Sequence, residues 1–152
     1  MPPGEGCPKL GRMPLPYPAL KPCPCQSGRS FASCCQPALN AERAAQTPEA
    51  LMRSRYVAYA LQDEAYLRRT WAAETCPDDL EATDGTRYQG LRIHRAEGDT
   101  VEFSAKLKLP DGRRGTLRER STFEQRGGEW VYVDGVVLNS QAGVTDTPAD
   151  KD

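Results

Sequence analysis

The run CPCQSGRSFASCC, residues 23–35, carries four cysteines in the spacing C-x-C-x8-C-C. Cys23 and Cys25 flank one proline, and Cys34 and Cys35 are adjacent beyond a turn marked by Ser27-Gly28. Four thiolates gathered by a short turn form a closed tetrahedral ligand set for a soft divalent metal, most simply Zn²⁺. Because no coordination position stays open for substrate or water, the spacing predicts a structural metal site and not a metalloenzyme centre.

The redox environment decides between a metal site and oxidised cysteines. Proline and glycine stand near the N-terminus where the apolar segment of a signal peptide would lie, and no apolar run is long enough to span a membrane. We therefore expect a cytoplasmic protein whose thiols stay reduced. The alternatives to a metal are four free thiols or a vicinal disulfide between Cys34 and Cys35.

Length and composition set broad limits. The chain has 152 residues, 38% hydrophobic and 27% charged, with a formal net charge of −1. This is enough chain for one core and a small appendage. The charge balance gives no overall argument for a nucleic acid or an anionic membrane as partner.

The chain divides into four predicted parts. Residues 1–21 form a proline-rich leader that we expect to be disordered or polyproline-like, and Met13 is an alternative start to Met1. Residues 22–37 form the metal knuckle, and residues 38–138 form a folded domain. The polar residues 139–152 are expected to be a disordered tail.

Helical signals come first in the folded domain. Asn40 is positioned to cap a helix over AERAAQ, residues 41–46. Thr47, followed by Pro48, caps a helix over residues 48–62, and Asp63 caps a third over residues 64–71.

Strand signals follow the helices. The stretches YQGLRIHRA, TVEFSAKLKL, GTLRERSTFEQR and EWVYVDGVVL, which begin at residues 88, 100, 115 and 129, are separated by glycine-containing turns. Helices followed by an antiparallel meander predict an α+β fold, with the helices packed on one face of a curved sheet.

Two family resemblances support this order of elements. CPCQSGRSFASCC resembles the SEC-C motif, the zinc-binding tail of the SecA translocation ATPase. ALMRSRYVAYALQDEAYLRRTW (50–71) and LRERSTFEQRGGEWVYVDG (117–135) resemble the YchJ family. That family joins a SEC-C motif to a domain resembling nuclear transport factor 2 (NTF2), a cone of sheet and helices. The family commonly has Trp-His-Pro after the third helix, where this chain has Trp71-Ala72-Ala73.

A candidate pocket lies inside the predicted cone. Alternation carries Glu119 and Ser121 toward the core beside Leu117 and Phe123. A buried carboxylate needs a partner, and Arg53 or Arg55 is available. The pair is either an internal ion pair, which we favour, or the polar floor of a ligand pocket. The remaining candidate pocket residues are Tyr56, Trp130 and Tyr132.

The sequence favours a zinc-binding adaptor. The knuckle would dock to a protein or ribosomal partner, and the cone would hold a second partner or a small ligand, with no membrane contact. The alternative is a small-molecule enzyme, isomerase-like or hydrolase-like, that works around Glu119 without support from the single histidine, His94. A weaker expectation is contact with RNA phosphates through the basic cluster, Lys106, Lys108, Arg113, Arg114, Arg118 and Arg120.

Overall fold

The computed structural model describes residues 14–78, 80 and 85–140. The predicted tail from residue 141 and the leader as far as Met13 lie outside the described residues. The elements are a 3₁₀ turn η1 (Phe31–Ser33), helices α1 (Gln36–Leu39), α2 (Pro48–Ala60) and α3 (Glu64–Arg69), and strands β1 (Arg87–Glu97), β2 (Thr100–Lys108), β3 (Arg114–Arg126) and β4 (Glu129–Ser140).

The four strands form one antiparallel meander in the order β1-β2-β3-β4, as predicted. In its register, Phe103 on β2 pairs with Glu119 on β3, and Glu119 pairs with Val137 on β4. Gly127 and Gly128 join β3 to β4 with φ values of +60° and +85°, which glycine adopts without steric cost.

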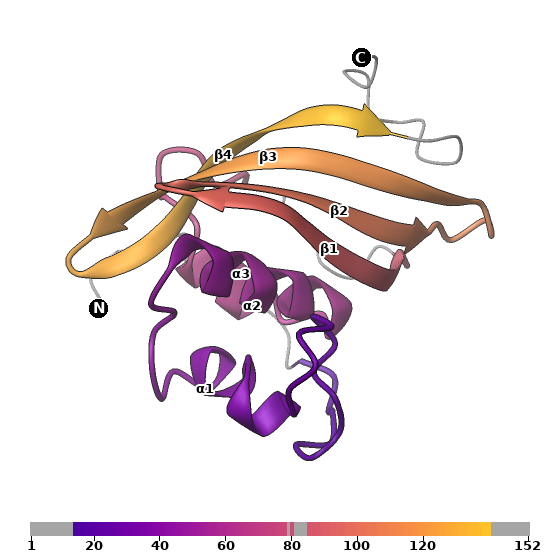
Figure 1. Cartoon of the computed structure of the whole chain (residues 1–152), viewed down its shortest axis with the longest axis horizontal. Coiled ribbons are helices and arrows are strands. Elements are labelled where there is room, and N and C mark those ends of the chain that lie inside the picture. Colours follow the sequence, from indigo (N-terminus) through magenta and orange to yellow (C-terminus); the bar gives the residue numbers. More distant parts are fainter. Residues whose placement is uncertain (1–13, 79, 81–84, 141–152) are drawn as a thin grey trace.

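Helices α2 and α3 lie on one face of the curved sheet, and α1 and the knuckle lie beyond them (Figure 1). The core forms where α2 meets the inner face of the sheet, because Val57 of α2 and Val101 and Phe123 of the sheet are fully buried. After α3 the chain pairs with β4, since Ala72 N–H donates to the Tyr132 carbonyl at 2.8 Å. This contact closes one end of the cone. None of the described helices is long and apolar enough to cross a membrane.

Two of the three predicted helix starts are confirmed. The side chain of Thr47 accepts a hydrogen bond from the N–H of Ala50, and that of Asp63 accepts one from the N–H of Tyr66. These caps satisfy backbone donors that a helix N-terminus leaves unpaired.

The predicted helix over residues 41–46 is wrong. The helix in this region is α1, which begins earlier with a proline in its first turn, and Asn40 follows its end. Ala41 has a φ of +63°, and the N–H of Glu42 donates to the Pro37 carbonyl at 2.8 Å. This is a Schellman arrangement, which terminates a helix by satisfying its last carbonyls.

The leader prediction also needs correction over residues 14–21, which lie against the domain. Leu15 N–H donates to the Leu61 carbonyl at 2.7 Å, and Ala32 N–H donates to the Ala19 carbonyl at 2.8 Å. The Tyr17 ring packs edge-on against Phe31 with ring centroids 5.2 Å apart. These backbone hydrogen bonds and the aromatic contact hold the segment in place despite its prolines. At the other end, β4 continues to Ser140, two residues into the predicted tail.

Candidate metal centre and cone cavity

The backbone of the knuckle turns back on itself so that both cysteine pairs face inward. Cys23 N–H donates to the Arg29 carbonyl at 2.8 Å, and Gln26 N–H donates to the Cys23 carbonyl at 2.9 Å. Gly28 makes the turn with a φ of +93°, a conformation that favours glycine. A bridge between Pro22 and Ser30 joins the two arms of the knuckle.

The structure brings the four predicted ligands, Cys23, Cys25, Cys34 and Cys35, into one cluster. Their sulfur atoms all lie within 4.8 Å of one another. The Cys25 and Cys34 sulfurs are 3.6 Å apart, and those of Cys34 and Cys35 are 3.9 Å apart. Four sulfurs in a tetrahedron around a metal at 2.3 Å are separated by about 3.8 Å. The cluster could therefore hold a metal ion.

The adjacent cysteines converge because the chain changes direction between them. Cys34 follows η1 with φ −122° and ψ −92°, and Cys35 stands before the first residue of α1. The chain thus changes direction between η1 and α1, and both adjacent sulfurs reach the same cluster. Cys23, Cys25 and Cys35 are buried, and Cys34 is half-buried.

Polar groups from the knuckle and α2 surround the sulfurs. The Ser27 hydroxyl lies 3.1 Å from the Cys34 sulfur. Arg53 Nη1 donates to the Cys25 carbonyl at 2.9 Å and lies 3.7 Å from the Cys25 sulfur. Arg53 therefore belongs to the knuckle and not to the candidate pocket. Its carboxylate partner is Glu49, at 3.1 Å, and not Glu119.

Mutual contact sets the ionisation of the buried thiols. Donation from Cys23, then from Cys35, holds the pKa of Cys25 far below its ordinary value. Contact with Cys25 raises the pKa of Cys23 to about 12, and contacts with Cys23 and Cys25 raise that of Cys35 much further. A divalent cation offsets the repulsion between thiolates, so its binding would release protons.

The knuckle shares its core with the cone. Its buried cysteines and Phe31 belong to the same apolar cluster as Leu51 and Met52 of α2. The Gln26 side chain accepts a hydrogen bond from the N–H of Leu91 on β1 at 3.4 Å.

A second feature is a cavity of about 250 Å³ between α2 and the inner face of the sheet. Five of the seven predicted pocket residues line it, namely Arg55, Tyr56, Glu119, Ser121 and Tyr132. The apolar and aromatic residues that complete the lining are Met52, Tyr59, Tyr88, Phe103, Ala105, Leu107 and Leu117.

Glu119 is held at the floor of this cavity. Its Oε2 accepts hydrogen bonds from the Ser121 and Tyr132 hydroxyls, each at 3.2 Å. Gly135 on β4 leaves space for the carboxyl group, since a Cβ there would clash with it. Burial raises the pKa of Glu119 above its ordinary value, and the hydrogen bonds and Arg55 oppose that rise.

Arg55 also lines this cavity and is buried, and it does not form the expected ion pair. Its guanidinium lies between the rings of Trp71 and Tyr132, at 4.7 and 4.6 Å from their centroids. Among the described residues, no carboxylate lies within the 4.0 Å that defines an ion pair with Arg55. Tyr132 stands between Arg55 and Glu119 by contacting both.

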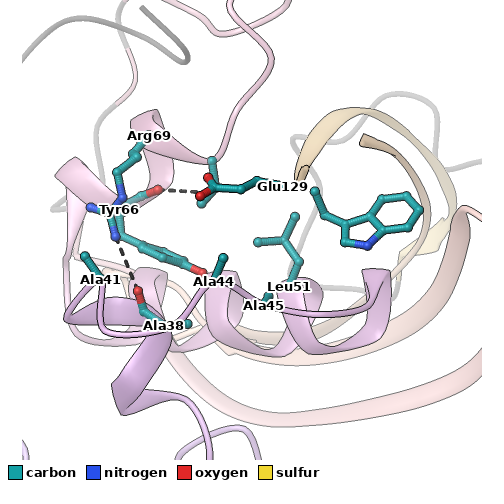
Figure 2. Close-up of a pocket in the computed structure, with 10 residues that line it drawn as sticks. Ala38, Ala41, Ala44, Ala45, Leu51, Tyr66, Arg69 and Glu129 are labelled. Carbon is teal, nitrogen blue, oxygen red and sulfur yellow. Dashed lines mark hydrogen bonds between the residues drawn. The ribbon is translucent and has the colours of Figure 1, made fainter. Parts of the chain in front are cut away.

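Trp130 lies outside the cone cavity. It lines a separate pocket of about 100 Å³, formed mainly by alanines near α1 together with Tyr66, Arg69 and Glu129 (Figure 2). Two of its lining residues are in contact, because Arg69 donates a hydrogen bond to the Ala38 carbonyl at 3.3 Å. The pocket thus lies between α1, α3 and the start of β4.

Sequence reasoning missed two of the four tyrosines that line the cavity. Tyr59 faces inward from α2, and Tyr88 faces it from β1, with ring centroids 5.7 Å apart. Tyr59 follows Arg55 and Met52 at spacings of four and seven residues, so helical periodicity could have placed it in the lining.

The comparisons with known proteins agree with both parts of the structure. Residues 21–37 match the SEC-C motif, and residues 47–135 match the family model described as the YchJ middle NTF2-like domain. The solution structure of a SEC-C motif containing protein from Rhodopseudomonas palustris is 35% identical, with a TM-score of 0.68 over 77% of this chain and 98% of that chain. The class is therefore a SEC-C motif joined to an NTF2-like domain.

Sequence relatives then identify the family. A UPF0225 protein of Deinococcus radiodurans is 62% identical over 118 residues, covering 78% of this chain and 91% of its own. The UPF0225 protein YchJ of Shigella dysenteriae is 34% identical over 123 residues, covering 74% and 81%. This chain belongs to the YchJ family.

Proposed function

We propose that the protein is a zinc-binding adaptor whose knuckle docks to a protein partner. The observation that carries the proposal is the cluster of four cysteine sulfurs within 4.8 Å of one another. A complete set of four thiolates leaves no open position, so the metal would stabilise a surface and would not activate a substrate.

Zinc is the metal that best suits this ligand set. It accepts four thiolates in a tetrahedron, has no redox chemistry, and is the usual metal of four-cysteine structural sites. Iron also binds four thiolates, and the two metals differ in absorption spectrum and in metal analysis. Arg53 and Ser27, which contact the sulfurs, would offset the net negative charge of a four-thiolate zinc site.

The docking surface that we propose is the exposed rim of the knuckle. Leu20, three residues before Cys23, is 87% exposed and so offers apolar surface to a partner. Lys21 and Arg29 are also exposed, and their backbone carbonyls accept hydrogen bonds from the N–H groups of Phe31 and Cys23, respectively. An exposed apolar side chain together with two exposed cations suits a partner surface that offers apolar contact and acidic groups.

The test combines metal analysis with affinity capture. Wild type, Cys25→Ser/Cys35→Ser, Leu20→Asp and Val136→Asp are purified without added metal or chelator. Val136 is the matched control, because it is an exposed apolar residue on β4, far along the chain from the knuckle. We expect one zinc per chain in all but the cysteine variant, and partners retained only by wild type and Val136→Asp. Partners that survive both the cysteine and Leu20 changes would contradict docking through the knuckle.

A second candidate partner is RNA, through the face of the sheet opposite the helices. The register aligns Arg87, Lys108 and Arg114 in one row across three strands. Such a row favours contact with phosphates, whose affinity falls steeply with salt. We expect charge reversal at Lys108 and Arg114 to abolish any salt-sensitive RNA binding, and binding that is insensitive to salt would contradict this candidate.

An enzyme remains the alternative function because Glu119 sits in a cavity and burial raises its pKa. His94 gives it no support, because it bonds to Ser104 between β1 and β2 and is exposed. Turnover that Glu119→Gln abolishes without loss of ligand binding would favour the enzyme over the adaptor.

A further inference from the structure

The cone cavity contains a buried cation whose hydrogen-bonding capacity is only partly used. Arg55 is 3% exposed. Its Nη1 donates to the Leu67 carbonyl at 3.0 Å and to the Thr70 hydroxyl at 2.7 Å. Among the described residues, Nε and Nη2 have no hydrogen-bond acceptor, although a guanidinium carries five N–H donors.

The residue that carries these remaining donors lines the cavity. Among the described residues, Trp71 Nε1 is the one fully buried side-chain polar atom without a hydrogen-bond partner. Because Nε and Nη2 of Arg55 also have no partner in the described part of the chain but are not in that class, they are not fully enclosed by protein atoms. The stacked rings of Trp71 and Tyr132 fix the plane of the guanidinium. The structure thus holds a rigid cation with free donors at the wall of a cavity, which suits a planar anion.

Glu119 is not positioned to neutralise Arg55. It lines the same cavity, but its Oε2 is engaged by Ser121 and Tyr132. Burial raises the pKa of the Glu119 carboxyl group, and the charge of Arg55 opposes that rise without an ion-pair contact. A buried guanidinium without a contacting carboxylate is costly, and an anion that contacts it would offset that cost.

The rest of the cavity is apolar and aromatic. Tyr88 meets Tyr56 and Tyr59 with ring centroids 5.8 and 5.7 Å apart, and Phe103, Leu107 and Leu117 add apolar surface. Tyr59, Tyr88 and Leu117 are half-buried, so the cavity opens to solvent on their side. A cavity of roughly 150 Å³ accommodates benzene. About 250 Å³ therefore has room for one ring with a short acidic side chain.

We propose that the cone cavity binds a small monocarboxylic acid with an apolar body, whose carboxylate contacts Arg55 and whose body lies against Tyr59, Tyr88 and Leu117. The site is separate from the metal cluster, and its occupancy does not depend on the proposed docking function. Recognition combines charge-assisted hydrogen bonds at one end with burial of apolar surface at the other.

The experiment titrates the zinc-loaded full chain with phenylacetate and hexanoate, and with their uncharged amides as controls, by calorimetry and by protein NMR. We expect saturable binding of a carboxylate and binding of its amide weaker by about tenfold or more. Shifted NMR signals should map to α2, β1, β2 and β3, which supply most of the lining of the cavity. Equal affinity for acid and amide, or no saturable binding of either acid into the millimolar range, overturns the proposal.

Matched variants identify the site. Arg55→Met removes the cation of the cavity. Arg118→Met is the control, because Arg118 forms an ion pair with Glu102 and does not line the cavity. Ala105→Leu fills the cavity without touching any charge, which keeps the test decisive if Arg55→Met fails to fold. We expect Ala105→Leu to lose binding and Arg118→Met to keep it. Full affinity in Ala105→Leu, with the same signals shifted, would place the ligand elsewhere and overturn the proposal.

Discussion

The Arg53 guanidinium donates a 2.9 Å hydrogen bond to the carbonyl oxygen of Cys25 and so joins α2 to the backbone of the metal knuckle. The contact spans 28 residues of sequence and links a predicted ligand to the helix that forms one wall of the cone. This hydrogen bond adds to the shared apolar core and to the contact between Gln26 and Leu91, which also connect the knuckle to the cone.

Replacing this arginine should loosen the metal site. Arg53→Met removes the donor to Cys25 and the ion pair with Glu49, and we expect a loss of about 1 kcal/mol in unfolding free energy. Zinc should also transfer faster to a chelating dye. Arg29→Met is the control, because its side chain lies on the exposed surface of the knuckle. Equal transfer rates in the two variants would show that Arg53 does not support the site.

Removing the metal should destabilise the whole folded unit. The buried cysteines belong to the same apolar cluster as α2 and the sheet, so the knuckle and cone share a core. We expect chelation, or Cys25→Ser/Cys35→Ser, to lower the melting temperature while leaving one cooperative transition. Calorimetry with and without chelator measures this. Two separate transitions, or a melting temperature unaffected by metal, would mean that the knuckle is an independent module.

Gly135 should tolerate no side chain while Glu119 is present. A Cβ at Gly135 would lie 2.9 Å from Glu119 Cδ and 3.0 Å from the Tyr132 hydroxyl. We expect Gly135→Ala to cost about 1–3 kcal/mol of stability. The matched control is Gly90→Ala on β1, where the nearest atoms are 3.7 Å away. Denaturant unfolding of Gly135→Ala/Glu119→Ala should recover part of the loss, and purely additive costs would exclude the clash as its cause.

Glu119→Gln should change how stability depends on pH. Burial raises the folded-state pKa of Glu119, although Ser121, Tyr132 and Arg55 oppose the rise and Asp134 adds to it. Below the ordinary value of 4.5 the group is protonated in both states and carries no penalty. As pH rises from there through the folded pKa, the unfolded chain ionises first and wild type loses stability. We expect Glu119→Gln to match wild type in acid and to exceed it at neutral pH. A stability difference that is constant with pH would contradict this.

Local signals explain what could be predicted. Alternation from Val101 to Leu107 and the glycine turns predicted the sheet, and the side-chain caps at Thr47 and Asp63 predicted α2 and α3. The spacing of the four cysteines was enough to predict their cluster. In each case the physical cause lies within a few neighbouring residues.

The predictions were wrong where contacts between distant parts of the chain determine the position of a residue. Arg53 and Arg55 are two residues apart and point to different parts of the molecule, one to Cys25 and the other between Trp71 and Tyr132. Two arginines on one helix do not reveal from the sequence which of them faces the sheet. Backbone hydrogen bonds, such as the one to Leu61, hold the segment near Leu15 in place. Such bonds do not depend on side-chain type, so the sequence shows no periodic pattern that could have predicted this position.

The most direct test of the central claim is X-ray absorption at the zinc edge on protein purified without added metal. The account predicts one zinc per chain with four sulfur neighbours at about 2.3 Å, and fewer sulfurs in Cys25→Ser/Cys35→Ser. Protein that carries no metal, or zinc bound by nitrogen and oxygen in place of the four sulfurs, would contradict the account.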